Sequence, residues 1–254
     1  MIFDAHAHFL LAGDPDKATA AAPPVPGLHV LACGVETADM EKTIRLWGGE
    51  RPGGIAAGAR VRPFIGIHPW FPMDDLSVRM DKLERLVAAN PWVGVGEIGL
   101  DRHRTDNPFP LQEDCFRKQL EIAAAYKRPA NIHCVRAFGA LIEGLRDFSS
   151  SGIPFLVHAY SGSKETVREI VDLGGYLSFA PFTIQRKSGQ ERPERAVEAL
   201  RAVPADRLLL DTDFPERKGQ GMAEYPAVLE RLYADTAEIR SEERRVGKEC
   251  RSRW

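Results

Sequence analysis

The chain has 254 residues, of which 44% are hydrophobic and 28% are charged, and its formal net charge is −2. This length is enough for one large core, because single-domain α/β barrels typically need ~250 residues. The slightly negative charge excludes a global basic field that gathers nucleic acid, so any recognition of phosphate has to be local. No apolar stretch approaches the ~18 residues of a membrane span, and we therefore expect no membrane partner.

Four cysteines, Cys33, Cys115, Cys134 and Cys250, are scattered along the chain without CxxC spacing. This pattern is typical of reduced thiols rather than of a disulfide framework. The N-terminus also lacks the basic segment followed by an apolar segment that marks a secretory signal peptide. We therefore expect a cytoplasmic location.

Short apolar runs alternate with stretches of helical periodicity along the chain. Eight runs are apolar on both faces, as is typical of parallel strands that helices cover. These predicted strands span residues 2–4, 28–33, 63–67, 92–98, 130–132, 155–157, 176–179 and 208–210. Apolar stripes with the 3–4 spacing of amphipathic helices lie in residues 76–87, 116–124, 167–171 and 228–232.

Eight strand–helix units in a chain of this length predict an α/β fold, a (β/α)8 barrel of the TIM type. A doubly wound open sheet is the structural alternative. Residues 11–27, 101–110 and 180–192 lack periodicity and are predicted to be loops after strands. In such a barrel these loops lie on the face that carries the active site.

The last residues differ in composition from the rest of the chain. Residues 241–254 hold five Lys or Arg and three Glu, with almost no apolar stripe. They resemble a vector-derived remnant, and a genuine charged tail is the alternative. We therefore predict a single barrel domain over residues 1–240, followed by a tail that takes no part in the site.

The first apolar run ends in Asp4-Ala5-His6-Ala7-His8. In an extended segment, residues two apart point to the same side, so His6 and His8 can reach one point together. Neutral imidazole is a preferred ligand for divalent transition metals. The alternative is a pair of unrelated surface histidines.

Ionisable residues recur at the later predicted strands. His68 follows the third run, Glu97 lies in the fourth, and His133 ends the fifth. His158 ends the sixth and Asp213 follows the eighth. Because the carboxyl ends of barrel strands converge on one rim, and because a carboxylate in an apolar strand is costly unless paired or metal-bound, these positions predict a metal site. For each residue alone, a hydrogen-bonded structural role is the alternative.

Two further histidines are assigned differently. His29 begins the second predicted strand, at the opposite end of the barrel, and is predicted to be structural. His103 lies in the predicted loop after the fourth strand and is predicted to face the substrate or to support the site.

The candidate ligands predict two divalent metal ions. They divide into two sets that share one carboxylate: His6, His8 and Asp213; His133 and His158; and the shared Glu97. Two ions ~3.5–4 Å apart suit hydrolysis, because one activates a water while both stabilise developing negative charge. Nitrogen and oxygen ligands without thiolate indicate zinc, manganese, iron or magnesium and do not choose among them.

The motifs together resemble those of the TatD-related family of metal-dependent hydrolases. The matching pieces, in the family's order, lie in residues 3–8, 66–69, 94–101 (GVGEIGLD), 129–133, 158–163 and 210–215. The resemblance implies a TIM-type barrel that hydrolyses phosphodiester bonds with divalent metals, often as a deoxyribonuclease. By motif position it implies metal roles for His6, His8, Glu97, His133, His158 and Asp213. It also implies that His68 helps to hold substrate phosphate, with Arg136 as the nearest candidate cationic clamp.

A hydrolytic mechanism follows from these roles. We predict that Asp213 orients the attacking water and accepts its proton, while Glu97 bridges the metals. His68 and Arg136 would contact non-bridging phosphate oxygens, of single-stranded DNA or another phosphodiester. Two alternatives stay open, because fold alone does not determine function. One is hydrolysis of a small-molecule amide, lactone or ester at the same rim, and the other is a non-catalytic metal-binding barrel.

Overall fold

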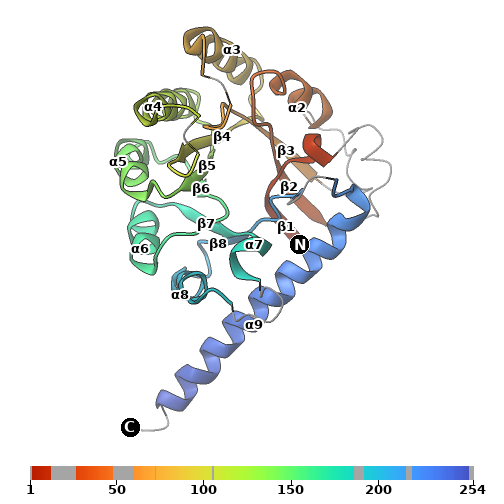
Figure 1. Cartoon of the computed structure of the whole chain (residues 1–254), viewed down its shortest axis with the longest axis vertical. Coiled ribbons are helices and arrows are strands. Elements are labelled where there is room, and N and C mark those ends of the chain that lie inside the picture. Colours follow the sequence, from red (N-terminus) through yellow and green to blue (C-terminus); the bar gives the residue numbers. More distant parts are fainter. Residues whose placement is uncertain are drawn as a thin grey trace.

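The computed structural model describes residues 2–12, 27–47, 60–71, 73–104, 106–185, 192–215 and 219–251. Across these ranges, eight parallel strands pair in one sheet in the order of the chain. Helices surround this ring of strands (Figure 1). A backbone bridge between Ala7 and Phe214 closes the ring. The predicted (β/α)8 barrel is thereby confirmed, and the doubly wound alternative is wrong, because an open sheet of that kind does not pair its strands in chain order.

The strands of the described residues are β1 Ile2–Ala7, β2 Leu28–Cys33, β3 Arg60–Ile65, β4 Gly94–Asp101, β5 Ala130–Val135, β6 Phe155–Val157, β7 Tyr176–Phe179 and β8 Leu208–Leu210. β1 and β5 run beyond the predicted apolar runs and so include His6 and His133. The predicted starts at residues 63 and 92 are wrong. β3 already pairs with β2 at Arg60, whereas Pro91 and Trp92 form a turn before β4.

The helices are α2 Met40–Trp47, α3 Leu76–Ala89, α4 Phe109–Ala125, α5 Phe138–Ser149, α6 Lys164–Asp172, α7 Pro181–Ile184, α8 Glu194–Ala202 and α9 Tyr225–Arg251, with short 3-10 helices η1 Phe9–Ala12 and η2 Met222–Glu224. The four predicted apolar stripes lie in α3, α4, α6 and α9. The prediction missed α2, α5, α7 and α8. In α5, buried Leu141, Leu145 and Phe148 have helical spacing, so that signal was present in the sequence.

All three predicted loops contain some regular structure. Residues 101 and 109–110 belong to β4 and α4, and residues 181–184 form α7, which begins at Pro181 because proline suits the first helical position. Within the predicted loop 11–27, residues 11 and 12 belong to η1. Residues 13–26 and 186–191 lie outside the described residues.

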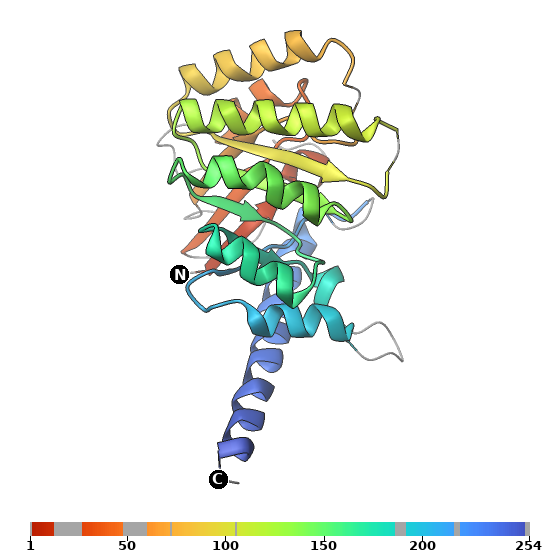
Figure 2. The ribbon, with the colours of Figure 1, turned by 90° about the vertical axis from the view of Figure 1, so that its left-hand side faces the viewer.

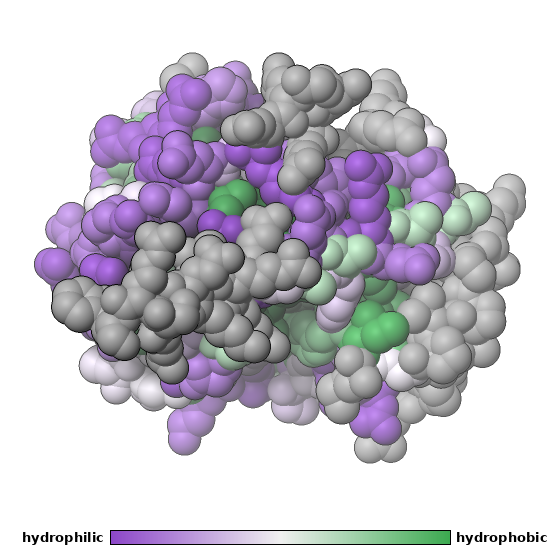
Figure 3. Space-filling model, turned by 90° about the horizontal axis from the view of Figure 1, so that it is seen from below, coloured by the Kyte–Doolittle hydropathy of each residue, from purple (hydrophilic) through white to green (hydrophobic). Residues whose placement is uncertain are grey.

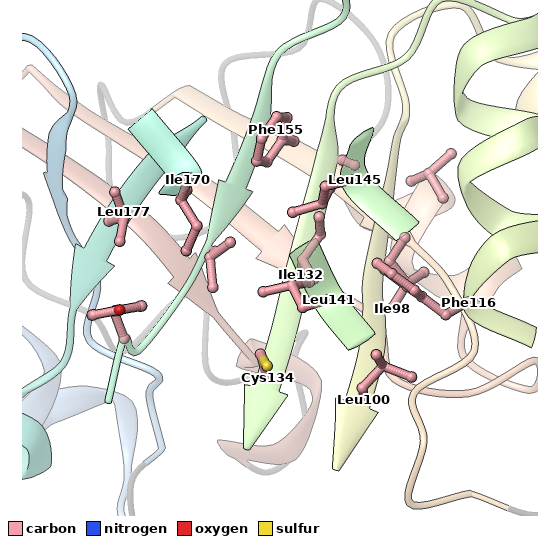
Figure 4. Packing of buried hydrophobic residues seen from close by; sticks show 14 of the residues in the cluster. Ile98, Leu100, Phe116, Ile132, Cys134, Leu141, Leu145, Phe155, Ile170 and Leu177 are labelled. Carbon is pink, nitrogen blue, oxygen red and sulfur yellow. The ribbon is translucent and has the colours of Figure 1, made fainter. Parts of the chain in front are cut away.

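The apolar core fills the space between the strands and the surrounding helices. Figure 4 shows Ile98 of β4 beside Phe116 of α4, and Ile132 of β5 beside Leu141 of α5. Each such side chain contributes ~1.5–3 kcal/mol when it is fully buried. On the face shown in Figure 3, the coloured surface is mostly hydrophilic, with smaller apolar areas. Helices on the outside and apolar contacts beneath them hold the strand ends in fixed positions on one rim.

The closure between β1 and β8 sets the position of the first ligand segment. The backbone N–H of Asp213 donates to the carbonyl of His6 at 3.0 Å. The buried carboxylate of Asp4 accepts hydrogen bonds from the N–H and hydroxyl of Thr212, at 2.9 and 2.7 Å, and from the hydroxyl of Tyr225 at 2.8 Å. Asp4 therefore ties β1 to the segment after β8 and to the first turn of α9.

The helix α9 passes the barrel and extends beyond it at the C-terminal end (Figure 2). Its backbone continues through the predicted boundary at residue 240 as far as Arg251. The boundary itself stays a prediction. Among the helices that the structure describes, none is both long and apolar enough to cross a membrane.

Candidate metal centre

Seven side chains, the six predicted metal ligands and His68, converge on the carboxyl ends of the strands. The described residues contain three sets of three side chains whose ligand atoms lie within 4.8 Å of one another. These sets are His6, His8 and Glu97; His68, Glu97 and His133; and His6, His158 and Asp213. Glu97 and His6 each belong to two of them, but the carboxylate of Glu97 is the centre of the cluster because its oxygens lie within 3.5 Å of a nitrogen of all five histidines.

Glu97 owes its position to the close approach of β4 and β5. A Cβ atom at Gly99 would overlap the backbone of His133, and the φ angle of Gly99 is +148°. Only glycine therefore allows β4 to lie this close to β5 at that level. In the motif around Glu97, Gly99 therefore allows the close approach of the two strands, and Glu97 supplies the carboxylate.

The first part of the cluster, which we term the β1 half, consists of His6, His8 and Asp213. The Nε2 atoms of His6 and His8 lie 2.9 Å apart. Oε2 of Glu97 lies 3.1 Å from Nε2 of His8 and 3.5 Å from Nε2 of His6. Oδ1 of Asp213 lies 3.4 and 3.7 Å from the same two nitrogens. Four ligand atoms therefore surround one point.

Hydrogen bonds on the outer side fix the tautomers of these two imidazoles. Nδ1 of His6 lies 2.9 Å from Oδ1 of Asn131, whose Nδ2 in turn donates to the carbonyl of Ala5. Nδ1 of His8 lies 3.0 Å from the carbonyl oxygen of Cys33. Because these oxygens only accept, both Nδ1 atoms carry protons and both Nε2 atoms present lone pairs. Two facing lone pairs require a shared cation, so this donor set fits a divalent metal ion.

The second part of the cluster, the β5 half, consists of His133, His158 and His68. All three approach Oε1 of Glu97: Nδ1 of His133 at 3.2 Å, Nε2 of His158 at 2.7 Å and Nε2 of His68 at 3.1 Å. Nε2–H of His133 donates to Oδ2 of Asp101 at 3.1 Å, which leaves its Nδ1 lone pair directed at the cluster. His133 therefore presents a lone pair to the cluster, as a metal ligand does.

His68 has the same tautomer as His133 but turns its other nitrogen, Nε2, toward the cluster. The backbone N–H of Trp70 donates to Nδ1 of His68 at 3.2 Å, so that nitrogen carries the lone pair. In the neutral ring the proton then lies on Nε2 and is donated toward Glu97. His68 consequently presents a hydrogen-bond donor rather than a ligand atom to the cluster.

His158 lies between the two halves. Its ring stacks on His6, with centroids 3.7 Å apart and an interplanar angle of 3°, although its Nε2 contacts the same Glu97 oxygen as His133. Its buried Nδ1 has no hydrogen-bond partner among the described residues. We predicted His158 in the same set as His133, and this assignment stays a prediction.

The charges of the cluster depend on one another. Burial raises the pKa of Glu97, but the imidazoles of His68, His158 and His6 outweigh it and hold that pKa well below its usual range. Burial and the neighbouring His6 lower the pKa of His8, whereas hydrogen bonds with Asp213 and Glu97 raise it to about 10. Without a metal ion, a proton therefore occupies the place where a cation fits, and metal binding would release it.

A cavity of about 230 Å³ opens above the cluster. His8, His68, Glu97, His133, His158 and Asp213 form its polar floor. Its walls are apolar and consist of Leu11, Val35, Trp70, Phe71, Phe182 and Pro215. The floor has the chemistry of a metal centre, and the walls have the chemistry of a site for a flat or apolar group.

Three predicted residues lie away from this floor. Arg136 is exposed with a φ of +53°, and His103 is exposed in the segment after β4; neither lines the cavity. Their predicted contacts with substrate stay predictions. His29 lies in β2, where its ring stacks on Phe3 with centroids 6.3 Å apart, as expected of a structural residue.

The sequence analysis missed the residues that orient the imidazoles. Asp101 closes the quoted motif of β4, and Asn131 lies two residues before His133, so both had positional signals. In a strand, residues two apart share a side, which would have directed Asn131 into the barrel. Their partners were not predictable, because Asn131 reaches His6 across 125 residues of sequence.

Comparisons with known proteins agree with this geometry. The sequence model of a family described as TatD related DNase matches residues 3–249. The uncharacterized metal-dependent hydrolase YabD of Bacillus subtilis is 30% identical over 190 residues, which cover 71% of this chain and 72% of that protein. The 3'-5' ssDNA/RNA exonuclease TatD of Klebsiella pneumoniae is 29% identical over 185 residues, with 70% and 69% covered.

Solved structures are similar in fold. The TatD homologue YJJV of Escherichia coli K12 superimposes with a TM-score of 0.71 at 22% identity, and the alignment covers 95% of both chains. A TatD family hydrolase of Entamoeba histolytica gives a TM-score of 0.65 at 20% identity, over 84% of this chain and 73% of that one. At these identities the similarity supports the barrel fold alone.

Proposed function

The chain belongs to the TatD-related DNase family of metal-dependent hydrolases, and from this we propose that it hydrolyses phosphodiester bonds in single-stranded DNA or RNA. We also propose that two divalent metal ions act at its rim. One observation supports the proposal of two metal ions. Oε2 of Glu97 faces His6 and His8. Oε1 faces His133 and His158. A carboxylate shared in this way is suited to bridge two cations.

The chain's own side chains supply both ligand sets. The β1 half and Oε2 of Glu97 would hold one ion, while His133, His158 and Oε1 of Glu97 would hold the other. The nitrogen and oxygen donors suit zinc, manganese, iron or magnesium. When bound, such ions lower the pKa of a water and stabilise negative charge that develops on phosphate.

Asp213 is the best-placed general base. Its side chain is 24% exposed to the cavity, whereas that of Glu97 is 2% exposed, so water reaches Asp213 more readily. Burial raises the pKa of Asp213, but the hydrogen bond with His8 and the charges of His8 and His6 hold it below its usual value. The carboxylate is therefore ionised at neutral pH and can orient a water and accept its proton.

His68 is the best-placed donor to the substrate. Its Nε2–H points into the cluster and its Nδ1 is occupied by the backbone of Trp70. A phosphate oxygen above the floor can accept this hydrogen bond. Arg136 and His103, both exposed near the rim, are proposed to contact more distant phosphates of a longer substrate.

The proposal is tested by elemental analysis of the purified protein together with cleavage of single-stranded DNA, with Glu97→Ala as the comparison. We expect two metal ions per chain, and loss of both metal and cleavage in the variant. Two ions without cleavage of DNA or RNA would redirect the assignment to a small amide, lactone or ester. Failure to bind any metal after reconstitution would contradict the metal centre altogether.

Two further proposals concern the whole chain. A single domain over residues 1–240 is supported by α9, whose Ile239 is buried and whose Arg240 donates to the carbonyls of Leu200 and Val203. A cytoplasmic location is supported by the described cysteines, Cys33, Cys115 and Cys134, which are buried free thiols. Limited proteolysis and cell fractionation would test these two proposals.

A further inference from the structure

The walls of the cavity above the cluster carry an unusual share of the exposed apolar surface. Six large apolar side chains are exposed in the described part of the chain. Three of them, Leu11, Trp70 and Phe182, line this one cavity. Exposed apolar surface gathered at a concave site is typical of ligand binding rather than of a random surface.

Phe182 is presented by its own short helix. In α7 the neighbouring Pro181, Thr183 and Ile184 are buried, whereas Phe182 is 53% exposed. The buried neighbours hold the backbone of α7 in place, so the phenyl ring projects into the cavity from a fixed base. A ligand can stack on such a ring without a loop having to become ordered first.

Trp70 forms an aromatic wall after β3. Its Nε1–H donates to Oδ2 of Asp101 and its backbone N–H to His68, so the indole is held from two sides. The guanidinium of Arg104 lies 4.1 Å from the centroid of the indole ring. The backbone N–H of Arg104 also donates to Oδ1 of Asp101, at 3.1 Å. The carboxylate of Asp101 thus positions three groups. They are the indole of Trp70, the backbone of Arg104 and the imidazole of His133.

We propose that Phe182 and Trp70 bind an unpaired nucleobase next to the scissile phosphate, with Arg104 on Trp70 placed for an adjacent phosphate. This inference rests on the proposed function, and it names how the substrate is selected. The polar floor suits the phosphate, and the apolar walls suit the face of a base. Stacking accepts any base, because every base has a π-face, but it requires that the base be unstacked from a duplex.

The chemistry of the walls also predicts that the site does not distinguish one base from another. The wall residues Leu11, Val35, Phe71, Phe182 and Pro215 have no polar side-chain atoms, and the indole N–H of Trp70 is already engaged by Asp101. Among the wall residues that the structure describes, no side-chain atom is available to read the hydrogen-bonding edge of a base. We therefore expect single-strand selectivity with little sequence preference.

The test removes the nucleobase from the ligand and the phenyl ring of Phe182 from the protein, each in a separate comparison. Binding of thymidine 5'-monophosphate and of deoxyribose 5-phosphate is measured by calorimetry for the wild type and for Phe182→Ala. We expect the wild type to bind the base-bearing ligand about tenfold more tightly, and Phe182→Ala to lose most of this ratio. Phe182→Trp should restore it. Trp92→Ala is the matched control, because Trp92 is another exposed aromatic residue, 39% exposed, that does not line the cavity.

Cleavage of an oligothymidylate and of the same oligomer with abasic terminal residues provides the second readout. If Phe182→Ala slows cleavage of both oligomers equally, the ring acts through the structure of the site and the inference is wrong. Equal binding of the two monophosphates by the wild type would overturn it as well. Base-dependent binding without cleavage of any oligomer would instead contradict the proposed nuclease function and leave the base site standing.

Discussion

The two halves of the candidate metal centre both place imidazoles around the carboxylate of Glu97, but they differ in the groups that hold those imidazoles from behind. In the β1 half, the outer nitrogens of His6 and His8 donate to neutral carbonyl oxygens, of Asn131 and Cys33. In the β5 half, the outer nitrogen of His133 donates to the carboxylate of Asp101. A carboxylate raises the basicity of an imidazole ligand more than a carbonyl does. The halves are therefore oriented equally well but are expected to differ in how strongly they hold a cation.

The largest effect that separates the halves is expected at Asp213, which belongs to the β1 half alone. Asp213→Asn should lower turnover on single-stranded DNA by about 10²–10⁴-fold, because the amide cannot accept a proton. The β5 half should keep its metal ion, since its contacts with Glu97 are untouched. Metal analysis and single-turnover cleavage of the same preparation check both statements. Full activity in this variant would remove the general-base role.

A smaller effect is expected when the negative charge of Asp101, which holds His133 in the β5 half, is removed. Asp101→Asn should weaken metal binding there by about 10–100-fold, because His133 loses an anionic hydrogen-bond acceptor. Competition with a chelator, followed by metal analysis, measures the change. Trp70→Phe is the matched control, since it removes the other side-chain hydrogen bond to Oδ2 of Asp101 while His133 keeps its own. An equal loss in both variants would mean that Asp101 acts through Trp70.

The corresponding change in the β1 half is expected to be milder. Asn131→Ala removes a neutral acceptor from His6, and we expect about a tenfold loss of metal affinity in that half, at the low end for such partners. Gln119→Ala is the matched control, because Gln119 is also a buried amide that bonds a neighbouring backbone, at Ile67. Both variants should lower the melting temperature, but only Asn131→Ala should change metal affinity. A larger loss than in Asp101→Asn would reverse the ranking of the two halves.

The two halves also show which features of the site could be predicted from the sequence alone. Spacing of two residues in β1 placed His6 and His8 on one side, and the rim of a barrel brought Glu97 and His133 to them. These inferences need only local periodicity and parallel strand order. The hydrogen bonds that choose each tautomer join residues that are far apart in sequence. His133 and Asp101 are 32 residues apart, and so their pairing depends on how neighbouring strands align.

Other features have local physical reasons that the sequence does not show. The backbone of Arg136 has a φ of +53° and its side chain is exposed, and its predicted contact with phosphate stays a prediction. Such a reversal in a non-glycine residue is uncommon and has no clear sequence signal. The helix α5 was missed although its apolar spacing is regular, so that omission was avoidable.

The smallest expected effect concerns two histidines within the β5 half. His68 and His133 approach the same oxygen of Glu97, at 3.1 and 3.2 Å, and distance alone does not separate a donor from a ligand. Their outer contacts do, because His68 accepts a hydrogen bond at Nδ1 while His133 donates one at Nε2. His68→Asn should therefore leave the metal content unchanged and lower kcat/KM by about threefold to tenfold, the net contribution of one typical hydrogen bond. His133→Asn in the same background should release metal. If His68→Asn releases metal as His133→Asn does, the tautomer of His68 is reversed and it is a ligand of the β5 half.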